Sequence, residues 1–443
     1  MTPSEQPPHD NRVLAGLRVF EVSIAVAAPS CGRHLAYHGA EVFKIEARSA
    51  PDVARMFGSA WARDPELADV FCDTSPYVAE MSAGKRSVGL ELKQPAAMEA
   101  ARRLLATCDV FLTNYSAPAI GELGLGYEAV AAVKPDIVYA GMTGFGATPG
   151  TPYFDFRAFG PNQSPLVGLD ELTGYPDQDP AGIASVAPPD YMGGLHATMA
   201  ILTALRRRDA DGEGSFLDIS QMETTVALLG PWLIGGDLGA AHPERTGSRL
   251  PWAAPVGVYP CLGDDKWVAV FVGSDEQWDA LAEAAGIAEE DRRTLAGRLE
   301  HHDEIDDALS EWTSRISADE AAARLQAVGV AAHPVHDHRG VLTDPHVRDR
   351  RYYEVRPCSR MGRDLMSGHP IRMSDTPASL ARAGPNMGED TVDLLGELGY
   401  DRDEIDALLE SGAAFAHARP EVTLQRPFDA WYEVFGLDDA APR

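Results

Sequence analysis

The stretch from Leu17 to Glu46 constrains the fold more than any other. A short apolar run at 17–22 precedes an apolar helical pattern over 30–38, and a second apolar run follows at 41–46. This order predicts a β-α-β unit with two parallel strands, because a helix connects them. Further strands are predicted at 86–92, 109–114 and 136–143, with a helix over 95–107. The first half of the chain is therefore expected to form an open, parallel α/β sheet.

The turn after the first predicted strand argues against a redox dinucleotide. Such a site needs Gly-x-Gly-x-x-Gly, so that the pyrophosphate can approach the backbone. The chain instead reads Ser-Ile-Ala-Val-Ala-Ala-Pro over 23–29, and the β-carbons of these residues obstruct that approach. Glu46 stands where a ribose-binding acid would lie, but without the glycines it does not make a dinucleotide site.

Charge and cysteine content narrow the choice of partners. The chain has 67 acidic and 38 basic residues, a net charge of −29, which repels nucleic-acid phosphates and anionic membranes. Its five cysteines are scattered with no Cys-x-x-Cys pair, which fits a reducing, cytoplasmic setting. We expect no nucleic-acid partner, no membrane segment and no export leader. The histidines near 333–346 lack metal-binding spacing, so no metal site is expected.

The second half of the chain changes character. Residues 147–190 form a Pro/Gly/Asp-rich passage, which we expect to be a functional loop. A strand at 215–220 lies between helices predicted at 192–206 and 221–229, the second of which Pro231 should end or kink. A hairpin is predicted over 256–272, followed by two or three helices over 276–327 and a strand at 329–335. A turn-rich stretch to 376 and helices at 389–398 and 402–410 complete the pattern.

These elements suggest a division into domains. We expect a Rossmann-like large domain over 1–225 and a smaller α+β domain over 226–335. Residues 336–412 should return to the large domain and complete it. Residues 413–443 should form a docking tail, because Phe428, Trp431, Tyr432 and Phe435 fall on one face of a helix.

Asp190 is the strongest candidate for chemistry. It stands between Pro188-Pro189 and, two residues on, Gly193-Gly194, just before a predicted helix. One interpretation is that Asp190 caps the helix N-terminus, which alone explains many aspartates in such a position. Glycines are poor helix starters, however, unless something must approach the backbone. A carboxylate with one side clear of β-carbons suits nucleophilic attack on a bulky acyl group.

Basic and polar residues lie near the ends of the predicted strands. Arg48, Lys85-Arg86 and Asn114-Tyr115 belong to consecutive strands. The carboxyl edge of a parallel sheet is where open α/β folds bind ligands, so these residues are candidates to hold phosphates. The alternative is that Lys85 and Arg86 are a solvated strand start.

Together these motifs resemble CoA-transferase family III, the CaiB/BaiF type, over about Leu14 to Gly412. The segments that carry the resemblance are Leu14–Val19, Gly39–Glu46, Gly84–Lys93, Gly124–Glu128, Gly144–Gly146, Asp190–Gly194, Val268–Val270, Gln277-Trp278, Thr343–His346 and Met387–Thr391. The resemblance implies a Rossmann-like large domain, a smaller domain and a homodimer whose subunits interlock as rings. It also implies a CoA-transferase that uses CoA and acyl-CoA as substrates and keeps no permanently bound cofactor.

The resemblance also assigns residues to roles. Asp190 takes the place of the catalytic aspartate. The CoA contacts of the family fall on Val26, Ala27, Arg48, Lys85, Arg86, Asn114, Tyr115, Thr143 and Gly144. We further predict that the N–H groups of Gly193 and Gly194 stabilise oxyanions, and that Phe159 and Asn162 lie on the substrate side.

Some departures from the family pattern leave alternatives open. The family's Asn-Phe-Arg-Pro reads Asn-Tyr-Ser-Ala over 114–117, and its Gly-Asn-Arg-His-Pro reads Gly-Ser-Arg-Leu-Pro over 247–251. A 2-methylacyl-CoA racemase would need a histidine where the chain has Phe159 or Gly160, and a glutamate where it has Ser274 or Asp275. The transferase is therefore favoured. A non-catalytic subunit of a heteromeric transferase is a further alternative.

The expected mechanism is covalent catalysis on Asp190. The carboxylate passes through an aspartyl acyl anhydride and an aspartyl-CoA thioester while CoA moves from a donor to an acceptor acid. The sequence over 162–177 is similar to transferases acting on aromatic or dicarboxylic acids, such as benzylsuccinate CoA-transferase. We expect an aromatic or dicarboxylic acceptor.

Overall fold

The chain forms two compact units in this computed structural model. The structure describes residues 11–56, 73, 75–182, 187–239, 245–287, 290–358 and 362–417. The first unit comprises residues 1–167, 183–234 and 345–443, and the second comprises 168–182 and 235–344. Residues 168–182 thus group with the second unit. The apolar stripe of the expected tail, Phe428 to Phe435, lies outside the described residues.

The first unit is built on a seven-stranded sheet with the order β12-β3-β2-β1-β4-β5-β6. The strands are β1 (Arg18–Val22), β2 (Glu41–Glu46), β3 (Arg86–Leu90), β4 (Val110–Thr113), β5 (Val138–Thr143), β6 (Ser215–Ser220) and β12 (Ala414–Phe415). β1 to β6 are all parallel, whereas β12 pairs antiparallel with β3. The predicted α/β class with a parallel sheet is confirmed. The strand order reverses between β1 and β4, and this reversal is the switch point at which open α/β sheets bind ligands.

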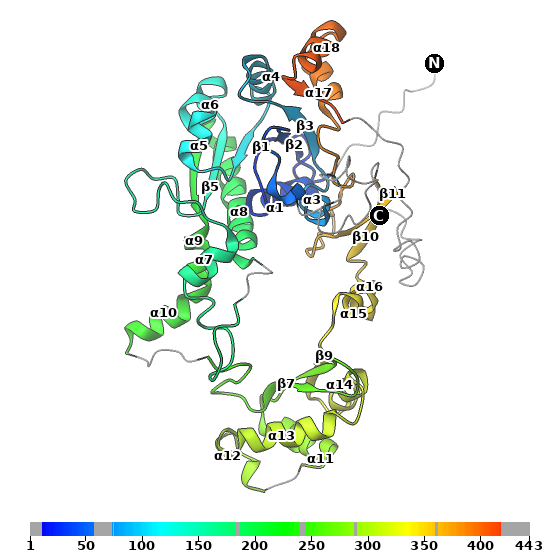
Figure 1. The fold of residues 1–443 in the computed structure, drawn as a ribbon. Helices are drawn as coiled ribbons and strands as arrows, with labels where there is room; N and C mark the ends of the chain where they lie inside the picture. The colour runs from blue at the N-terminus through cyan, green and yellow to red at the C-terminus, as the bar shows by residue number, and fades with distance from the viewer. Residues whose placement is uncertain are drawn as a thin grey trace. The chain divides into compact units, whose positions relative to one another are not determined.

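Helices cover both faces of this sheet (Figure 1). The helices of the first unit are α1 (Ala27–Tyr37), α2 (Val53–Met56), α3 (Pro76–Met81), α4 (Pro95–Leu105), α5 (Ala117–Glu122), α6 (Tyr127–Val133), α7 (Gly160–Leu166), α8 (Pro188–Asp211), α9 (Gln221–Val226), α16 (Pro345–Asp349), α17 (Thr391–Glu397) and α18 (Arg402–Glu410). After α9, a single 3-10 turn at Ala227–Leu229 leads into α10 (Gly230–Asp237). Pro231 therefore lies in the first turn of α10, where a missing N–H is tolerated.

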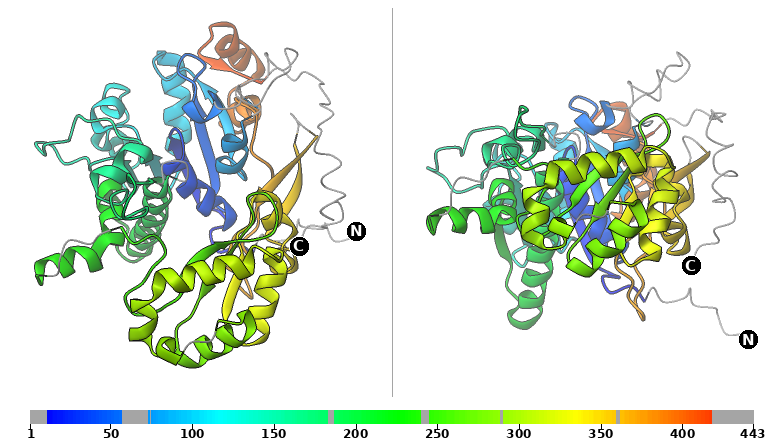
Figure 2. Two further views of the ribbon diagram at one scale, coloured as in Figure 1. Left: turned by 60° about the horizontal axis from the view of Figure 1, so that its bottom comes forward. Right: turned by 90° about the horizontal axis from the view of Figure 1, so that it is seen from below.

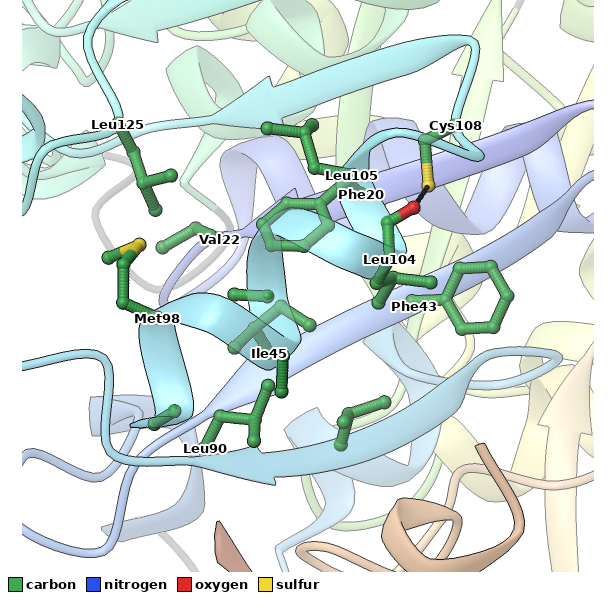
Figure 3. Packing of buried hydrophobic residues seen from close by; sticks show 14 of the residues in the cluster. Phe20, Val22, Phe43, Ile45, Leu90, Met98, Leu104, Leu105, Cys108 and Leu125 are labelled. Atoms are coloured by element: carbon green, nitrogen blue, oxygen red, sulfur yellow. Dashed lines mark hydrogen bonds between the residues drawn. The ribbon is translucent and has the colours of Figure 1, made fainter. Parts of the chain in front are cut away.

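Two apolar cores lie on opposite faces of the sheet. On one face, Phe20 and Phe111 stack at 5.6 Å between ring centroids. Leu104 of α4 is fully buried in the same cluster as Phe20 (Figure 3). On the other face, the buried residues come from α1 and α8, such as Leu35 and Ile201. The alternation of strand side chains between these two cores explains why each strand reads as a nearly continuous apolar run.

The second unit is a small α+β body. Its sheet joins β7 (Val256–Pro260), β8 (Trp267–Phe271) and β9 (Ala331–Pro334), all antiparallel. Four α-helices follow β8, namely α11 (Asp275–Ala285), α12 (Leu295–Glu300), α13 (His302–Thr313) and α14 (Ala318–Ala327), and α15 (His338–Thr343) follows β9. Figure 2 shows these helices in yellow-green beside the sheet. The predicted hairpin is confirmed, and the helical stretch holds more helices than the two or three expected.

The stretch before residue 376 contains two strands that were not predicted. We expected a turn-rich stretch, and within it an antiparallel hairpin forms from β10 (Tyr353–Cys358) and β11 (Gly362–Ser367). Its strands are rich in charged residues, so the apolar signal of a strand is weak. The Ser367 N–H donates to Glu80 Oε2 at 3.2 Å, which ties the hairpin to α3.

Among the described residues, no helix combines the length and the apolar character needed to cross a bilayer. No cluster of His, Cys, Asp and Glu in the described part of the chain is arranged to hold a metal ion.

Candidate active site

Asp190 lies in the first turn of α8. This 24-residue helix begins at Pro188, and its N-cap is Ala187 in the left-handed conformation with φ 48°. Asp190 is therefore the third helical residue, and the interpretation as an N-cap is wrong. Two prolines suit a helix start, because the first N–H groups have no partner within the helix. The positive end of the helix dipole stabilises a carboxylate in this turn.

The Asp190 carboxylate is buried and held by two donors. The side chain is 9% exposed, and Gln221 Nε2 donates to Oδ1 at 3.0 Å. Burial raises the pKa of Asp190, while the hydrogen bonds from Gln221 and from the Gly160 N–H act in the opposite direction. A β-carbon on Gly160 would lie 2.1 Å from Oδ2, so only glycine fits beside the carboxylate. A carboxylate with few water contacts and a raised pKa is a stronger nucleophile than an exposed one.

Two glutamines of the site escaped the sequence analysis. Gln221 follows β6 directly and opens α9. Gln163, on α7, donates from Nε2 to Gln221 Oε1 at 3.4 Å. Its own Oε1 atom is buried and has no hydrogen-bond partner among the residues that the structure describes. A polar residue immediately after a predicted strand on the carboxyl edge of the sheet was the signal for Gln221. Gln163 gave no signal, because its loop was not expected to contain a helix.

Gly193 and Gly194 have a packing role, so the prediction that they form an oxyanion site was wrong. Both are buried in the interior of α8, where N–H groups bond to carbonyls one turn back. A β-carbon on Gly194 would lie 2.0 Å from Ser30 Oγ, and one on Gly193 would lie 2.9 Å from Gln221 Cγ. The two glycines allow α8 to approach α1 and Gln221 closely.

Phe159 and Asn162 lie at the start of α7, before and after Gly160, whose N–H donates to the Asp190 carboxylate. Asn162 Oδ1 accepts the Phe159 N–H at 2.6 Å, which orders this helix start. Phe159 is 52% exposed, and Asp190 contacts the following residue, Gly160. The two residues thus belong to the helix start that supplies the Gly160 N–H, within the passage that was expected to be a loop.

A pocket of about 800 Å³ opens at the carboxyl ends of β1 to β3 and beside the loop after β4. This volume lies within the usual range for small-molecule sites. Its wall includes Ser23, Ile24, Ile45, Glu46, Ala47, Ser49, Asp52, Leu90, Lys93, Met98, Tyr115 and Leu123. The pocket thus occupies the switch point, and Tyr115 is the predicted CoA contact that lines it directly.

The other predicted CoA contacts near this edge have diverse environments. Val26 precedes α1 as its N-cap residue, and Ala27 is its first residue. The Arg48 guanidinium lies over the Phe415 ring at 4.5 Å, and the flanking Ala47 and Ser49 line the pocket. Thr143 Oγ1, at the end of β5, is buried and finds no hydrogen-bond partner within the described part of the chain.

Asn114 and Gly144 are held by the protein itself. The Asn114 amide exchanges two hydrogen bonds with the backbone of Ile24, at 2.9 and 2.8 Å. A β-carbon on Gly144 would lie 2.3 Å from the β-carbon of Ala158. Asn114 therefore fixes the β1–α1 turn, and Gly144 permits the close packing of the chain before α7.

The placement of Lys85 and Arg86 at the carboxyl edge was wrong. Arg86 begins β3, and it pairs with Glu41 at 2.8 Å and with Glu397 at 2.9 Å. Lys85 is fully buried, and its ammonium donates to both carboxylate oxygens of Glu21, at 2.9 and 2.8 Å, and to the Pro29 carbonyl. Burial lowers the pKa of Lys85 to about 8 despite the Glu21 charge. Lys85 is an internal ion-pair partner in this structure.

Comparison with known proteins agrees with this architecture. CoA-transferase family III matches residues 14–391. The chain is 30% identical to the succinyl-CoA–D-citramalate CoA-transferase of Chloroflexus aurantiacus over 92% of this chain and 98% of that protein. It is also 30% identical to the beta subunit of the succinyl-CoA–L-malate CoA-transferase of the same organism, over 87% and 94%. A CaiB/BaiF family protein from Brucella suis shares the fold with a TM-score of 0.78 and 28% identity, over 88% of this chain and 100% of that one. The chain belongs to CoA-transferase family III and is a CoA-transferase.

Proposed function

We propose that Asp190 is the nucleophile that carries the acyl and CoA groups during transfer. The observation that carries this proposal is the buried Asp190 carboxylate, which has a raised pKa and is held by Gln221 and the Gly160 N–H. These two donors keep the carboxylate in one orientation, and the helix dipole supports its ionised form. Burial makes that ionised form reactive, because fewer water molecules compete with the thioester.

The proposed transfer has four steps, and each step forms one bond to an acyl carbon and breaks another. Asp190 attacks the donor thioester, the C–S bond breaks, and an aspartyl acyl anhydride and CoA thiolate result. The thiolate attacks the aspartyl carbonyl, forms aspartyl-CoA and releases the donor carboxylate. The acceptor carboxylate attacks aspartyl-CoA, giving a second anhydride and the thiolate. The thiolate finally attacks the acceptor acyl carbon, and the Asp190 carboxylate is restored. No proton is consumed, so the site has to exclude water rather than supply an acid.

The switch-point pocket is proposed to hold the nucleotide part of CoA. Its volume, its position at the carboxyl edge and the ring of Tyr115 support this use. Lys93 lines the pocket and Arg48 lies beside it, so both can attract phosphates against the net charge of −29. The pocket and the Gln221 amide both lie at the carboxyl edge of one sheet, which allows a long ligand to reach Asp190.

We propose a dicarboxylic acceptor acid. The two relatives described above are named for transfer from succinyl-CoA to L-malate and to D-citramalate. Phe159 and Asn162 are close in sequence to Gly160, whose N–H donates to Asp190, and are our candidates for contact with the acceptor. A screen of donor thioesters and acceptor acids tests this proposal, and an exclusive preference for aromatic acids would overturn it.

The covalent step can be trapped. Incubation with a donor acyl-CoA and hydroxylamine should convert Asp190 to the hydroxamate, which peptide mass spectrometry locates. Asp190→Ala should abolish transfer and trapping, whereas Asp136→Ala, at the amino edge of the sheet, should keep both. Transfer by Asp190→Ala at a rate near that of the wild type would refute the mechanism. Deuterium exchange at the acyl α-carbon without an acceptor would instead indicate a racemase.

A homodimer is proposed as the working form. Tyr191, Leu195, Met199 and Leu202 of α8 are 39%, 50%, 62% and 40% exposed and lie along one side of the helix. An exposed apolar stripe of this kind marks a protein interface. Leu195→Glu with Met199→Glu should yield monomers in analytical ultracentrifugation, whereas Arg207→Glu on the same helix should not. A monomeric wild-type chain would overturn the proposal.

One relative is named as the beta subunit of a CoA-transferase, so a heteromer with a related second chain is the alternative to the homodimer. Activity of the purified chain by itself supports the homodimer, and activity only with a related second chain supports a heteromer. We also propose a cytoplasmic setting, since Cys31, Cys108 and Cys261 are free thiols.

A further inference from the structure

The turn between β1 and α1 has a strained backbone. Ala25 has a φ of +60°, a left-handed conformation that residues with a β-carbon rarely adopt. The chain has no glycine over 23–29 to supply this conformation without strain. Strain of this kind persists only where the surrounding structure holds it, and it concentrates at ligand sites. Side-chain hydrogen bonds to this turn hold it in the left-handed conformation.

Asp52, in the loop after β2, holds the turn from one side. Its Oδ1 atom accepts the N–H groups of Ala25 at 2.7 Å and of Ala54 at 2.9 Å. Its Oδ2 atom accepts from Lys44 Nζ at 2.7 Å. Asp52 and Lys44 are 5% and 1% exposed, so these bonds are largely shielded from water. Both carboxylate oxygens of Asp52 are thus used within the protein.

Asn114, at the end of β4, holds the turn from the other side. Its Oδ1 atom accepts the Ile24 N–H and its Nδ2 atom donates to the Ile24 carbonyl. The turn is therefore fixed by side chains on both sides of the switch point. In a Rossmann nucleotide site the glycine-rich backbone itself shapes this turn. Here buried side-chain contacts supply the shape that the sequence of the turn does not.

The same turn forms part of the pocket wall. Val22, Ser23 and Ile24 line the 800 Å³ pocket together with Asp52 and Tyr115. We propose that Asp52, supported by Lys44, is a positioning residue for acyl-CoA: its bond to the Ala25 N–H holds the turn in the shape that the bound nucleotide requires. Relaxation of Ala25 toward an ordinary conformation would move Ile24 and deform this wall.

Two double variants separate the effect of the hydrogen bond to Ala25 from the effect of the Lys44 and Asp52 charges. Lys44→Met with Asp52→Asn removes both charges but leaves an amide oxygen to accept the Ala25 N–H. Lys44→Met with Asp52→Ala removes the charges and the acceptor. The first variant should bind CoA within about twofold of the wild type, and the second about tenfold more weakly, in isothermal titration calorimetry. The KM for acyl-CoA should rise in parallel while kcat changes little.

Asp109 provides a matched control at the amino edge of the sheet. Its carboxylate accepts one backbone N–H, from Arg18 at 2.9 Å, where Asp52 accepts two, and like Asp52 it pairs with one cation, Arg208 at 3.1 Å. Asp109→Ala should lower the unfolding temperature without weakening CoA binding. Equal affinities of the two double variants would overturn the proposal. Weakening by Asp109→Ala equal to that by the acceptor-free variant would also overturn it, because loss of stability alone would then account for the effect.

The kinetic part of this inference rests on the proposed function, but the calorimetry does not. If the wild type binds CoA and transfers none, the proposed function fails and the comparison of affinities still decides the role of Asp52. If the wild type transfers CoA and both double variants keep its KM, the role of Asp52 fails alone.

Discussion

Removal of the Gln221 amide should move the pH dependence of transfer. In the proposed mechanism Asp190 must be ionised to attack, so kcat/KM should fall as the pH drops through the pKa of Asp190. The Gln221 hydrogen bond favours the ionised form and lowers this pKa, against the larger effect of burial, which raises it. Gln221→Met keeps a side chain of similar length and removes the donor at 3.0 Å. The acidic limb of the profile should therefore shift to higher pH.

The size of the shift follows from the strength of the lost bond. A hydrogen bond to a charged group contributes about 1.5–3 kcal/mol, equivalent to roughly one to two pH units. Because the Gly160 N–H still supports the carboxylate, we expect about one unit. The assay is kcat/KM for the donor acyl-CoA between pH 4 and 8. An unchanged or lower midpoint would refute this account of Asp190.

A control for this experiment is Gln326→Met in the second unit. Gln326 also donates from its amide to a single acceptor, the Ala332 carbonyl at 2.7 Å. This variant removes the same chemical group at a position remote from Asp190 in the sequence. The acidic limb of its kcat/KM profile should therefore coincide with that of the wild type. A shift in both variants would indicate a general loss of structure.

Three further substitutions test the fold around the site. Gly194→Ala would place a β-carbon 2.0 Å from Ser30 Oγ, so urea unfolding should show a loss of about 1–3 kcal/mol. Arg55→Met would leave Glu46 and Asp73 as buried carboxylates without their guanidinium, which lies 2.6 and 2.7 Å away, at a cost of about 3–5 kcal/mol in the same assay. Lys85→Met should lower the unfolding temperature and leave the Kd for CoA unchanged, because Lys85 is buried against Glu21.

The first two substitutions have control variants, and the third has an outcome that would contradict its prediction. Gly396→Ala, where an added β-carbon meets no atom within 4 Å, should not destabilise the protein. Arg402→Met removes an exposed ion pair with Asp406 and should cost less than about 1 kcal/mol. A rise in the Kd for CoA in Lys85→Met, with stability unchanged, would restore Lys85 as a phosphate contact.

The parallel sheet could be predicted because its strands are short apolar runs separated by helices. Local sequence patterns were less informative where contacts between distant residues determine the structure. The helix was predicted to begin at residue 192, whereas it begins at Pro188, because proline is well suited to the first turn of a helix. Residues 168–182 group with the second unit, where Arg245 bonds Glu171 at 2.8 Å, and no local pattern indicates that contact.

Asp190 could be found from sequence, but its surroundings could not. The carboxylate stood out through its prolines and glycines, yet its donor Gln221 lies 31 residues away in sequence. Lys85 was misplaced for a related reason: its partner Glu21 lies 64 residues earlier, and a buried ion pair looks like a surface charge until the partner is known. Long-range polar partners define this site, and one sequence contains no periodicity that reveals them.

The last described strand has a consequence for solubility. β12 pairs antiparallel with β3, and the Glu91 N–H donates to the Ala413 carbonyl at 2.9 Å. Without these residues, β3 would present a row of unpaired N–H and carbonyl groups along its outer side. Such an edge accepts strands from neighbouring molecules and promotes aggregation. The short segment Ala413–Phe415 thus protects the sheet that carries the proposed transferase site.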